Sequence, residues 1–173
     1  MSLCELTLIE AADAVRAGRV TSRALVEATL ARIALWQPVI NAYVSVQAEA
    51  ALAAADRADA AVRRGEPLGP LHGVPLAHKD MYFRPGHRSS MGSRAAPPAG
   101  DVLSTVLARL DAAGAIELGC LNMAEFALGP TGHNAHFGDC RNPWNPGHVA
   151  CGSSSGSGAA VGARLAWGSF GSD

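Results

Sequence analysis

The chain has 173 residues, of which 49% are hydrophobic and 17% are charged. This length fits one domain with a hydrophobic core, and the composition excludes a disordered or highly charged chain. The formal net charge of −1 gives no electrostatic reason to expect nucleic acid or an anionic membrane as the main partner. No apolar run approaches the roughly 20 residues of a membrane span, and the first residues lack the pattern of a signal peptide. We therefore expect a cytoplasmic protein.

The first 65 residues are predicted to be helical. Thr7 and Glu10 have the spacing of a capping box, and Gly18 marks the end of a first helix. Ser22 is placed to cap a second helix, because its hydroxyl can accept a hydrogen bond from a free N–H of the first turn.

A proline then predicts a break in the chain. Gln37 precedes Pro38, and a residue before proline is driven into an extended conformation. A third, alanine-rich helix is predicted from about Glu49 to Arg64, with Gly65 as its stop. We expect these helices to support the fold, because nothing in them indicates chemistry.

From residue 66 to residue 173 the pattern predicts an α/β core. The short apolar run at 73–77 predicts a strand that delivers Lys79 at its end. Residues 84–100 indicate a long loop, and Asp101 is placed to cap the helix that follows.

A second strand is predicted at residues 115–118, directly after Gly114. Strand, helix and strand in this order favour a right-handed βαβ unit in a largely parallel sheet. Residues 127–152 carry glycines, prolines and asparagines with little periodicity, and a loop of this length in a compact domain is usually functional.

Residues 152–158 form the most distinctive segment, with four serines among three glycines. Glycines let the backbone approach a ligand closely, and a helix that begins here would point free N–H groups at an anion. The segment lacks the lysine of a P-loop and the G-x-G-x-x-G spacing of a dinucleotide-binding loop. Taken alone, it fits a catalytic serine, a non-enzymatic anion-binding module or a flexible linker.

Lys79 favours the catalytic interpretation. A lysine is usually a solvated surface cation, but this one directly follows an apolar strand. Burial disfavours the charged form of an amine and lowers its pKa, as a general base near neutral pH requires. Because a serine hydroxyl is a poor nucleophile until a base removes its proton, a buried lysine and a serine loop together indicate nucleophilic catalysis.

Four segments in chain order resemble the motifs of the amidase signature family. They are GVPLAHKD (73–80), LNMAEFA (121–127), NPWNP (142–146) and GSSSGS (152–157). Together they cover about residues 68–173, and the helical N-terminal part is also typical of the family. The resemblance implies an α/β fold with N-terminal helices followed by part of a mixed, largely parallel sheet core, truncated within a single domain.

The resemblance also implies a Ser–cis-Ser–Lys triad. Lys79 would be the general base. Ser153, linked to its neighbour by a cis peptide bond, would pass a proton between the nucleophile and the neutral amine of Lys79. Gly152, Ser154 and Ser155 would support the loop, with the serines satisfying backbone groups or the helix start. No metal and no cofactor are expected.

The nucleophile of the family stands in a Gly-Ser/Thr-Asp-x-Gly-Gly-Ser segment. Gly171, Ser172 and Asp173 begin this segment, so the nucleophilic serine is expected just beyond Asp173, about four residues further on. Ser169 and Ser172 lie before that position and are not expected to replace it. We therefore expect an inactive fragment, which forms a homodimer or associates through exposed core surface.

Cysteine positions suggest structural rather than chemical roles. The four cysteines include no C-x-x-C pair, so free thiols are expected and a zinc site is not. Cys151 stands where the family usually has glycine, and Cys120 stands near a common lysine or arginine position. If the position of Cys151 needs a positive φ, its Cβ costs about 1–2 kcal/mol.

Other polar residues near these motifs are given supporting roles. Asp80 is expected to cap the turn after the strand rather than to orient the lysine amine. His133 and His136 lie in the 127–152 loop, where contacts with substrate or backbone are expected in preference to a metal.

The expected activity is hydrolysis of the C–N bond of a small-molecule amide through an acyl-enzyme. A rival within the family is the A subunit of a glutamyl/aspartyl-tRNA amidotransferase, with a glutaminase role and a protein partner that binds the RNA. His78 and residues 82–84 resemble the free-standing amidases more closely. A rival outside the family is the anion-binding module that uses residues 152–158.

Overall fold

The structure is a computed structural model and describes residues 2–95 and 98–172. It is a mixed α/β fold. The α-helices are α1 (Leu8–Arg16), α2 (Ser22–Ile40), α3 (Ala48–Arg63), α4 (Thr105–Ala112) and α5 (Ser155–Gly162). The strands are β1 (Tyr43–Val46), β2 (Pro75–Lys79), β3 (Ile116–Leu121), β4 (Arg141–Asn142) and β5 (Asn145–Val149). Two short 3-10 helices are η1 (Leu3–Glu5) and η2 (Glu125–Ala127).

A mixed three-stranded sheet in the order β1-β3-β2 forms the centre of the fold. β2 and β3 are parallel, with Lys79 opposite Leu121, and α4 lies between them in the chain. The predicted βαβ unit is therefore confirmed. β1 is antiparallel to β3, which makes the sheet mixed.

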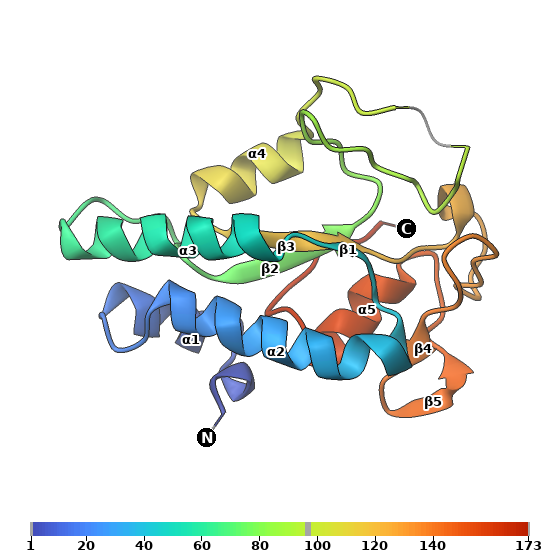
Figure 1. Ribbon diagram of the computed structural model, residues 1–173, viewed down its shortest axis with the longest axis horizontal. Helices are drawn as coiled ribbons and strands as arrows, with labels where there is room; N and C mark the ends of the chain where they lie inside the picture. The colour runs from blue at the N-terminus through green and yellow to red at the C-terminus, as the bar shows by residue number, and fades with distance from the viewer. Residues whose placement is uncertain (1, 96–97, 173) are drawn as a thin grey trace.

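Helices lie on both faces of this sheet. In Figure 1, α1, α2 and α5 lie below the sheet and α4 lies above it. The main core cluster joins α2, α3 and α5 to the sheet, and it includes Val26, Ile33 and Leu118, each at most 4% exposed. A second cluster packs α1 against the start of β2. Apolar burial, at about 25 cal/mol per Å², is the main force that holds these helices on the sheet.

The strand β1 lies in the region that was predicted to be helical. It has only four residues, which run from buried Tyr43 through two partly buried residues to exposed Val46, so it carries little periodic signal. Gly119 lets β1 approach β3 closely, because a Cβ there would lie 2.1 Å from the carbonyl oxygen of Ser45. Gly119 also belongs to a bulge, since β3 has one residue more than β2 between Glu117 and Cys120.

The first helix begins and ends as predicted. The Thr7 hydroxyl accepts a hydrogen bond from the Glu10 N–H at 3.3 Å, and the Glu10 carboxylate accepts one from the Thr7 N–H at 2.7 Å. This reciprocal pair is a capping box. Gly18, with φ of +65°, follows the end of the helix.

The start of α2 differs from the prediction, because Ser22 is not its cap. Thr21 occupies the cap position, and its hydroxyl accepts from the Ala24 N–H at 3.0 Å. The N–H groups of Ser22 and Arg23 donate instead to the buried Asp59 carboxylate of α3, at 2.7 and 3.1 Å. A carboxylate at this end is favourable because the helix dipole is positive there.

The helix α2 continues through Pro38, so the predicted break is wrong. Pro38 removes one N–H donor, but it lies only two residues before the helix ends. Ile40 is buried in the main core, and the Gln37 side chain bonds both backbone groups of Tyr43, at 2.9 and 2.8 Å. These tertiary contacts outweigh the local preference, and Asn41, with φ of 55°, ends the helix.

The helix α4 begins four residues after the predicted cap, Asp101. Ser104 precedes its first residue and bonds the backbone of Phe83 in both directions, each at 2.8 Å. These contacts tie the start of α4 to the loop after β2. That loop, predicted at 84–100, contains no helix or named strand among its described residues, and Ala96 and Pro97 lie outside them.

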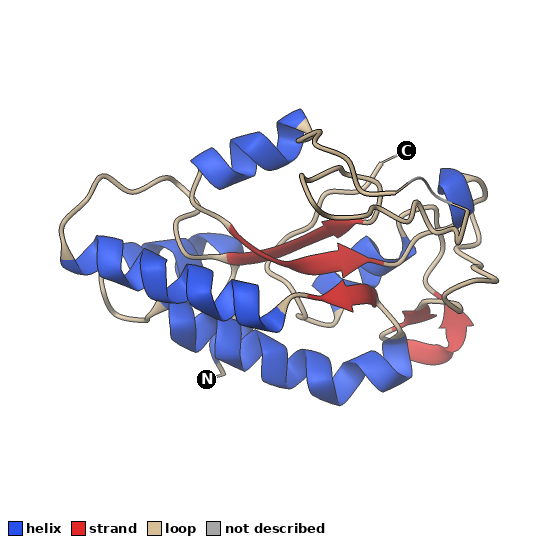
Figure 2. Ribbon diagram, turned by 45° about the horizontal axis from the view of Figure 1, so that its top comes forward, coloured by secondary structure: helices blue, strands red, loops and turns tan. Residues whose placement is uncertain are grey.

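The segment 127–152 was predicted to be a loop, but it contains a small hairpin. β4 and β5 pair antiparallel through Arg141 with Val149 and Asn142 with Asn145. Figure 2 shows this hairpin as a separate pair of short strands, away from the central sheet. No described helix is long and apolar enough to cross a membrane.

Candidate active site

The amine of Lys79 lies between two serine hydroxyls. Lys79 is the last residue of β2 and is 1% exposed. Its Nζ donates to Ser153 Oγ at 2.6 Å and to Ser172 Oγ at 2.7 Å. The motif resemblance implies that Lys79 and Ser153 act together, and the structure brings these two residues together.

The segment that follows α5 returns along the edge of β2 that β3 leaves uncovered. The Lys79 N–H donates to the Phe170 carbonyl at 3.0 Å, and the Ala77 N–H donates to the Gly168 carbonyl at 3.4 Å. The residue numbers of both partners increase together from one hydrogen bond to the next. Residues 168–170 therefore run parallel to β2 along its free edge. The ends of parallel segments meet at one edge, and this places Ser172 beside Lys79.

The position of Ser153 is set by main-chain contacts. The peptide bond between Gly152 and Ser153 is cis. The Ser153 carbonyl accepts from the Ala124 N–H at 2.9 Å, and the Gly152 N–H donates to the Pro130 carbonyl at 2.7 Å. A Cβ on Gly152 would lie 2.6 Å from the backbone nitrogen of Gly132. Only glycine fits this approach of two backbones.

Ser154 holds the segment that carries Ser172. The Ser154 hydroxyl donates to the Ser172 carbonyl, and its oxygen accepts from the Ser172 N–H, both at 3.0 Å. The Tyr82 hydroxyl donates to the adjacent Gly171 carbonyl at 2.5 Å. Ser154 thus satisfies backbone groups as predicted. Buried Ser155 does not, because its hydroxyl has no hydrogen-bond partner among the described residues.

The N-terminus of α5 packs tightly against the end of β3. The Gly156 N–H donates to the Asn122 carbonyl at 2.8 Å, and a Cβ on Gly156 would lie 2.4 Å from both the Ala42 carbonyl oxygen and the Asn122 nitrogen. The Gly158 N–H donates to the Ser154 carbonyl at 3.2 Å. These N–H groups are therefore occupied within the protein, which argues against an anion cradle here.

Two polar residues flank Lys79 in the sequence, His78 on β2 and Asp80 directly after it. The Asp80 carboxylate accepts from the N–H of Ser90 at 3.0 Å and from its hydroxyl, so Asp80 caps the following loop as predicted. His78 Nδ1 accepts from the Phe170 N–H at 3.1 Å. Burial lowers the pKa of His78 to about 4, so the imidazole is neutral near pH 7, as an acceptor nitrogen requires.

The other singled-out side chains have structural partners. Cys151 has φ of 60°, so the position does adopt the conformation that favours glycine. His133 Nδ1 lies 2.8 Å from an Asp139 carboxylate oxygen, and His136 Nε2 lies 2.8 Å from a carboxylate oxygen of η2. Each histidine ring therefore contacts a carboxylate, and the expected contact with substrate stays a prediction. The four cysteines are free thiols, as predicted.

A family comparison covers all of these residues. The model of the amidase family matches residues 24–173. The chain belongs to the amidase family. The match includes β2 with Lys79, the Ser153 loop and the segment that carries Ser172, so the family resemblance inferred from four motifs is confirmed.

Individual amidase relatives agree. The chain is 46% identical over 168 residues to the A subunit of the glutamyl-tRNA(Gln) amidotransferase of Halorhodospira halophila, covering 96% of this chain and 34% of the relative. A solved amidase structure matches with a TM-score of 0.91 and 38% identity, over 97% of this chain and 38% of its own. The peptide amidase of Stenotrophomonas maltophilia matches with a TM-score of 0.86 and 36% identity, over 94% of this chain and 35% of its own. The chain spans about a third of the length of the curated relatives it matches.

Two contacts in this amidase site were not foreseen. Ser172 was placed at the start of the nucleophile segment and rejected as a replacement nucleophile, and its bond to Lys79 was missed. Tyr82, which holds Gly171, was used only to compare subfamilies. One signal could have found Ser172, because it follows Gly171 at the start of the segment in which the family carries its nucleophile.

Proposed function

We propose that this amidase chain carries the base and the proton relay of an amide-hydrolysing site. Lys79 is the base and Ser153 is the relay. The observation that carries this assignment is the 2.6 Å contact between Lys79 Nζ and Ser153 Oγ, beside a cis peptide bond. Gly152 and Ser154 support the loop through their backbone contacts. The substrate is a small-molecule amide in the cytoplasm, and the chain is part of a single larger domain.

The proton path follows from the order of these groups. The neutral amine of Lys79 takes the proton of the Ser153 hydroxyl, while Ser153 takes the proton of a nucleophilic serine. The serine oxygen then forms a bond to the amide carbon. When the C–N bond breaks, the proton returns from Lys79 through Ser153 to the leaving amine. Water, activated along the same path, hydrolyses the acyl ester.

Ser172 acts as a positioning residue in this scheme. Its hydroxyl accepts a second hydrogen bond from Lys79 Nζ at 2.7 Å, and Ser154 fixes its backbone on both sides. The amine is thereby restrained toward Ser153, and a base that is already oriented loses less entropy in the transition state. Ser172 itself is bound through its hydroxyl to the base and is not assigned as the nucleophile.

The nucleophile is proposed to stand in the segment that follows Asp173 in the family motif. A split reconstitution tests this. The 173-residue chain is mixed with a second polypeptide, which is the part of the Halorhodospira halophila amidotransferase relative that follows its matched region. Release of ammonia or amine is then measured on a panel of primary and secondary amides, with each polypeptide alone as a reference.

We expect amide hydrolysis only when both polypeptides are present. A Lys79→Met variant should lower the rate by at least about 100-fold, the size of a general-base contribution. Arg88→Met, a change at an exposed cation of the loop after β2, is the matched control and should leave the rate within about twofold. Hydrolysis by the 173-residue chain alone, or an unchanged rate in Lys79→Met, would contradict the proposal.

A second candidate is the glutaminase role of an amidotransferase A subunit. The observation in its favour is the 46% identity to such a protein over 96% of the chain. His78 and residues 82–84 favour a free-standing amidase instead. The amide panel does not separate the two candidates, because the added polypeptide comes from an amidotransferase subunit and brings its own substrate preference. Co-purification of the 173-residue chain with a second subunit and glutaminase activity supports the glutaminase role, and purification without such a subunit supports the free-standing amidase.

A further inference from the structure

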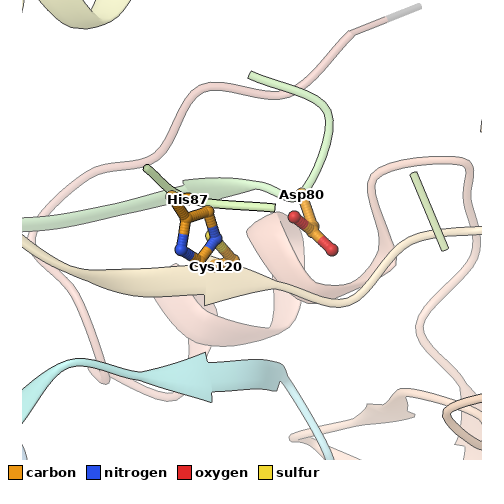
Figure 3. Close-up of side chains that lie close together, drawn as sticks. All are labelled: Asp80, His87 and Cys120. Atoms are coloured by element: carbon orange, nitrogen blue, oxygen red, sulfur yellow. The ribbon is translucent and has the colours of Figure 1, made fainter. Parts of the chain in front are cut away.

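Three potential metal ligands meet beside β2, outside the Lys79 site. Asp80, His87 and Cys120 each offer one ligand atom, and the three atoms all lie within 4.8 Å of one another. His87 Nε2 is 3.1 Å from Cys120 Sγ. Figure 3 shows the His87 ring over the Cys120 side chain of β3, with the Asp80 carboxyl group close to both.

The fold brings these residues together from distant parts of the chain. Asp80 directly follows β2, and Cys120 lies on the neighbouring strand β3. The bulge at Gly119 sets Cys120 opposite His78 on β2, two residues before Asp80. His87 comes from the loop after β2, where its N–H donates to the Arg84 carbonyl at 3.0 Å.

One carboxylate oxygen of the cluster receives no N–H or O–H hydrogen bond from the part of the chain that the structure describes. Asp80 is 2% exposed, and its Oδ2 accepts both bonds from Ser90. Its other oxygen, Oδ1, is buried and accepts no N–H or O–H hydrogen bond from the described residues, and the Cys120 thiol is a weak donor beside this carboxylate. A buried carboxylate oxygen that has at most a weak thiol donor is costly, and a cation at this point would satisfy it.

We propose that Asp80, His87 and Cys120 bind a zinc ion. Thiolate, imidazole and carboxylate are the ligands that zinc takes, and the sulfur excludes magnesium and calcium as the preferred ion. Ligand bonds of about 2.0–2.3 Å in a tetrahedral site separate the ligand atoms by about 3.3–3.8 Å. The His87–Cys120 separation of 3.1 Å is close to this range, and the remaining pairs lie within 4.8 Å, so side-chain movements of about 1 Å or less complete the site. One thiolate and one carboxylate neutralise the charge of the ion, so the complex can be buried.

The fourth coordination position faces a pocket. A pocket of about 500 Å³ is lined by Ser45, Asp80 and His87, with Arg88 and Arg94 at its side. Water from this pocket can complete the coordination, as in zinc sites with three protein ligands. The two arginines do not oppose binding strongly, because the ion and its two anionic ligands carry no net charge.

Binding requires a proton to leave Cys120. Burial, together with the nearby Asp80 and Glu117 carboxylates, raises the pKa of the Cys120 thiol, so the free protein holds the proton. A coordinating thiol is deprotonated by the metal, and the proton leaves to solvent through the pocket. Coordination through His87 Nε2 leaves Nδ1 protonated, and this nitrogen lies 3.5 Å from the Gln47 amide group. With its oxygen turned to the ring, Gln47 accepts that N–H and orients the ligand.

The ion would fasten the loop after β2 to the neighbouring strand. His87 is the only one of the three ligands that belongs to this loop rather than to a strand or its end. Coordination therefore ties the loop to β3 next to Lys79, and zinc should stabilise the folded protein because the unfolded chain does not preassemble the site.

Cobalt and zinc titrations of the 173-residue chain test the proposal. The protein is stripped with a chelator and titrated with Co²⁺ alone, and the thiolate-to-cobalt charge-transfer absorption is recorded. We expect the band to saturate at one equivalent and to disappear when one equivalent of Zn²⁺ is added. Zn²⁺ should also raise the melting temperature.

Single substitutions identify the ligands. Cys120→Ser should abolish the band, whereas Cys151→Ser, a change at an exposed cysteine outside the cluster, should leave it intact. His87→Gln should weaken Zn²⁺ binding by more than about tenfold and remove the zinc-dependent rise in melting temperature. Circular dichroism checks that each variant is folded. If Cys120→Ser does not fold, the zinc affinity of the His87→Gln variant decides the result, because His87 is only half-buried.

Three outcomes would overturn the proposal. One is the absence of stoichiometric metal after reloading, another is a band that persists in Cys120→Ser, and the third is His87→Gln binding zinc as tightly as the unchanged protein. Any of these would leave the cluster as a thiol–imidazole hydrogen bond without a metal.

Discussion

Ser154 and Ser172 are joined by two hydrogen bonds, one in each direction, at 3.0 Å. Ser154, which follows the cis peptide bond, thereby holds the backbone of Ser172, and the Ser172 hydroxyl contacts Lys79. Because Lys79 is the sole lysine of the chain, selective ¹³C labelling of lysine gives a single side-chain signal that reports on this arrangement.

The first prediction concerns the two hydrogen bonds between Ser154 and Ser172. Ser154→Ala removes both bonds, so the Ser172 amide should exchange with deuterium at least about tenfold faster, as expected for losing one to two hydrogen bonds. Ser169→Ala is the matched control, because its exposed hydroxyl reaches only the adjacent Phe170 carbonyl at 3.4 Å. Equal exchange at Ser172 in both variants would show that the 3.0 Å contacts do not hold the segment.

The second prediction separates the roles of the two serines that contact Lys79. In the reconstituted protein, Ser153→Ala should lower amide hydrolysis by at least about 100-fold, because the proton relay is lost. Ser172→Ala should cost only about tenfold, the value of one hydrogen bond to a charged or reacting group, and should shift the lysine ¹³C signal in the isolated chain. A larger loss of activity in Ser172→Ala than in Ser153→Ala would reverse the assignment.

The third prediction concerns the close packing of α5. Gly156→Ala would place a Cβ 2.4 Å from the Ala42 carbonyl oxygen and the Asn122 nitrogen, so we expect a loss of at least about 2 kcal/mol in the free energy of unfolding. Gly158→Ala, two residues further along the same helix, meets no atom within 4 Å. It should stabilise the protein by about 0.5–1 kcal/mol through the better helix propensity of alanine. Urea unfolding of both variants measures the contrast, and similar midpoints would refute it.

The fourth prediction concerns Cys151. Its φ of 60° favours glycine, so Cys151→Gly should raise the free energy of unfolding by about 0.5–1 kcal/mol after the added flexibility of the unfolded chain is subtracted. Cys151→Ala keeps the Cβ and should leave stability unchanged, which separates backbone strain from loss of the thiol. A gain in the alanine variant as large as that in the glycine variant would point to the thiol instead.

The parts of the site that could be predicted are those with a distinctive local pattern. Lys79 ends an apolar run and Ser153 lies in a glycine-serine segment, so both were assigned from the residues and their motifs. The contact between Lys79 and Ser172 depends on residues 168–170 adding to the edge of β2. That pairing joins segments about 90 residues apart, and no local pattern encodes it.

The errors in the fold have the same origin. Pro38 was expected to end α2, but Ile40 and the Gln37 side chain carry the helix two residues further through tertiary contacts. The strand β1 was missed because it is short and partly exposed, and only its pairing with β3 makes it a strand. The sequence predicted no zinc site, because the three proposed ligands come from separate segments rather than from a spaced cysteine motif.

The contacts of Gly152 with Gly132, and of Gly156 with Asn122, have a consequence for how this molecule tolerates change. Much of the geometry around Ser153 is set by one backbone lying directly on another. A scan that shortens side chains to alanine would therefore pass over the most sensitive positions, since glycine has nothing to remove. Substitutions at Gly152 and Gly156 disturb the fold because they add atoms. Among functional copies of this gene, we therefore expect the fewest substitutions at these closely packed glycines.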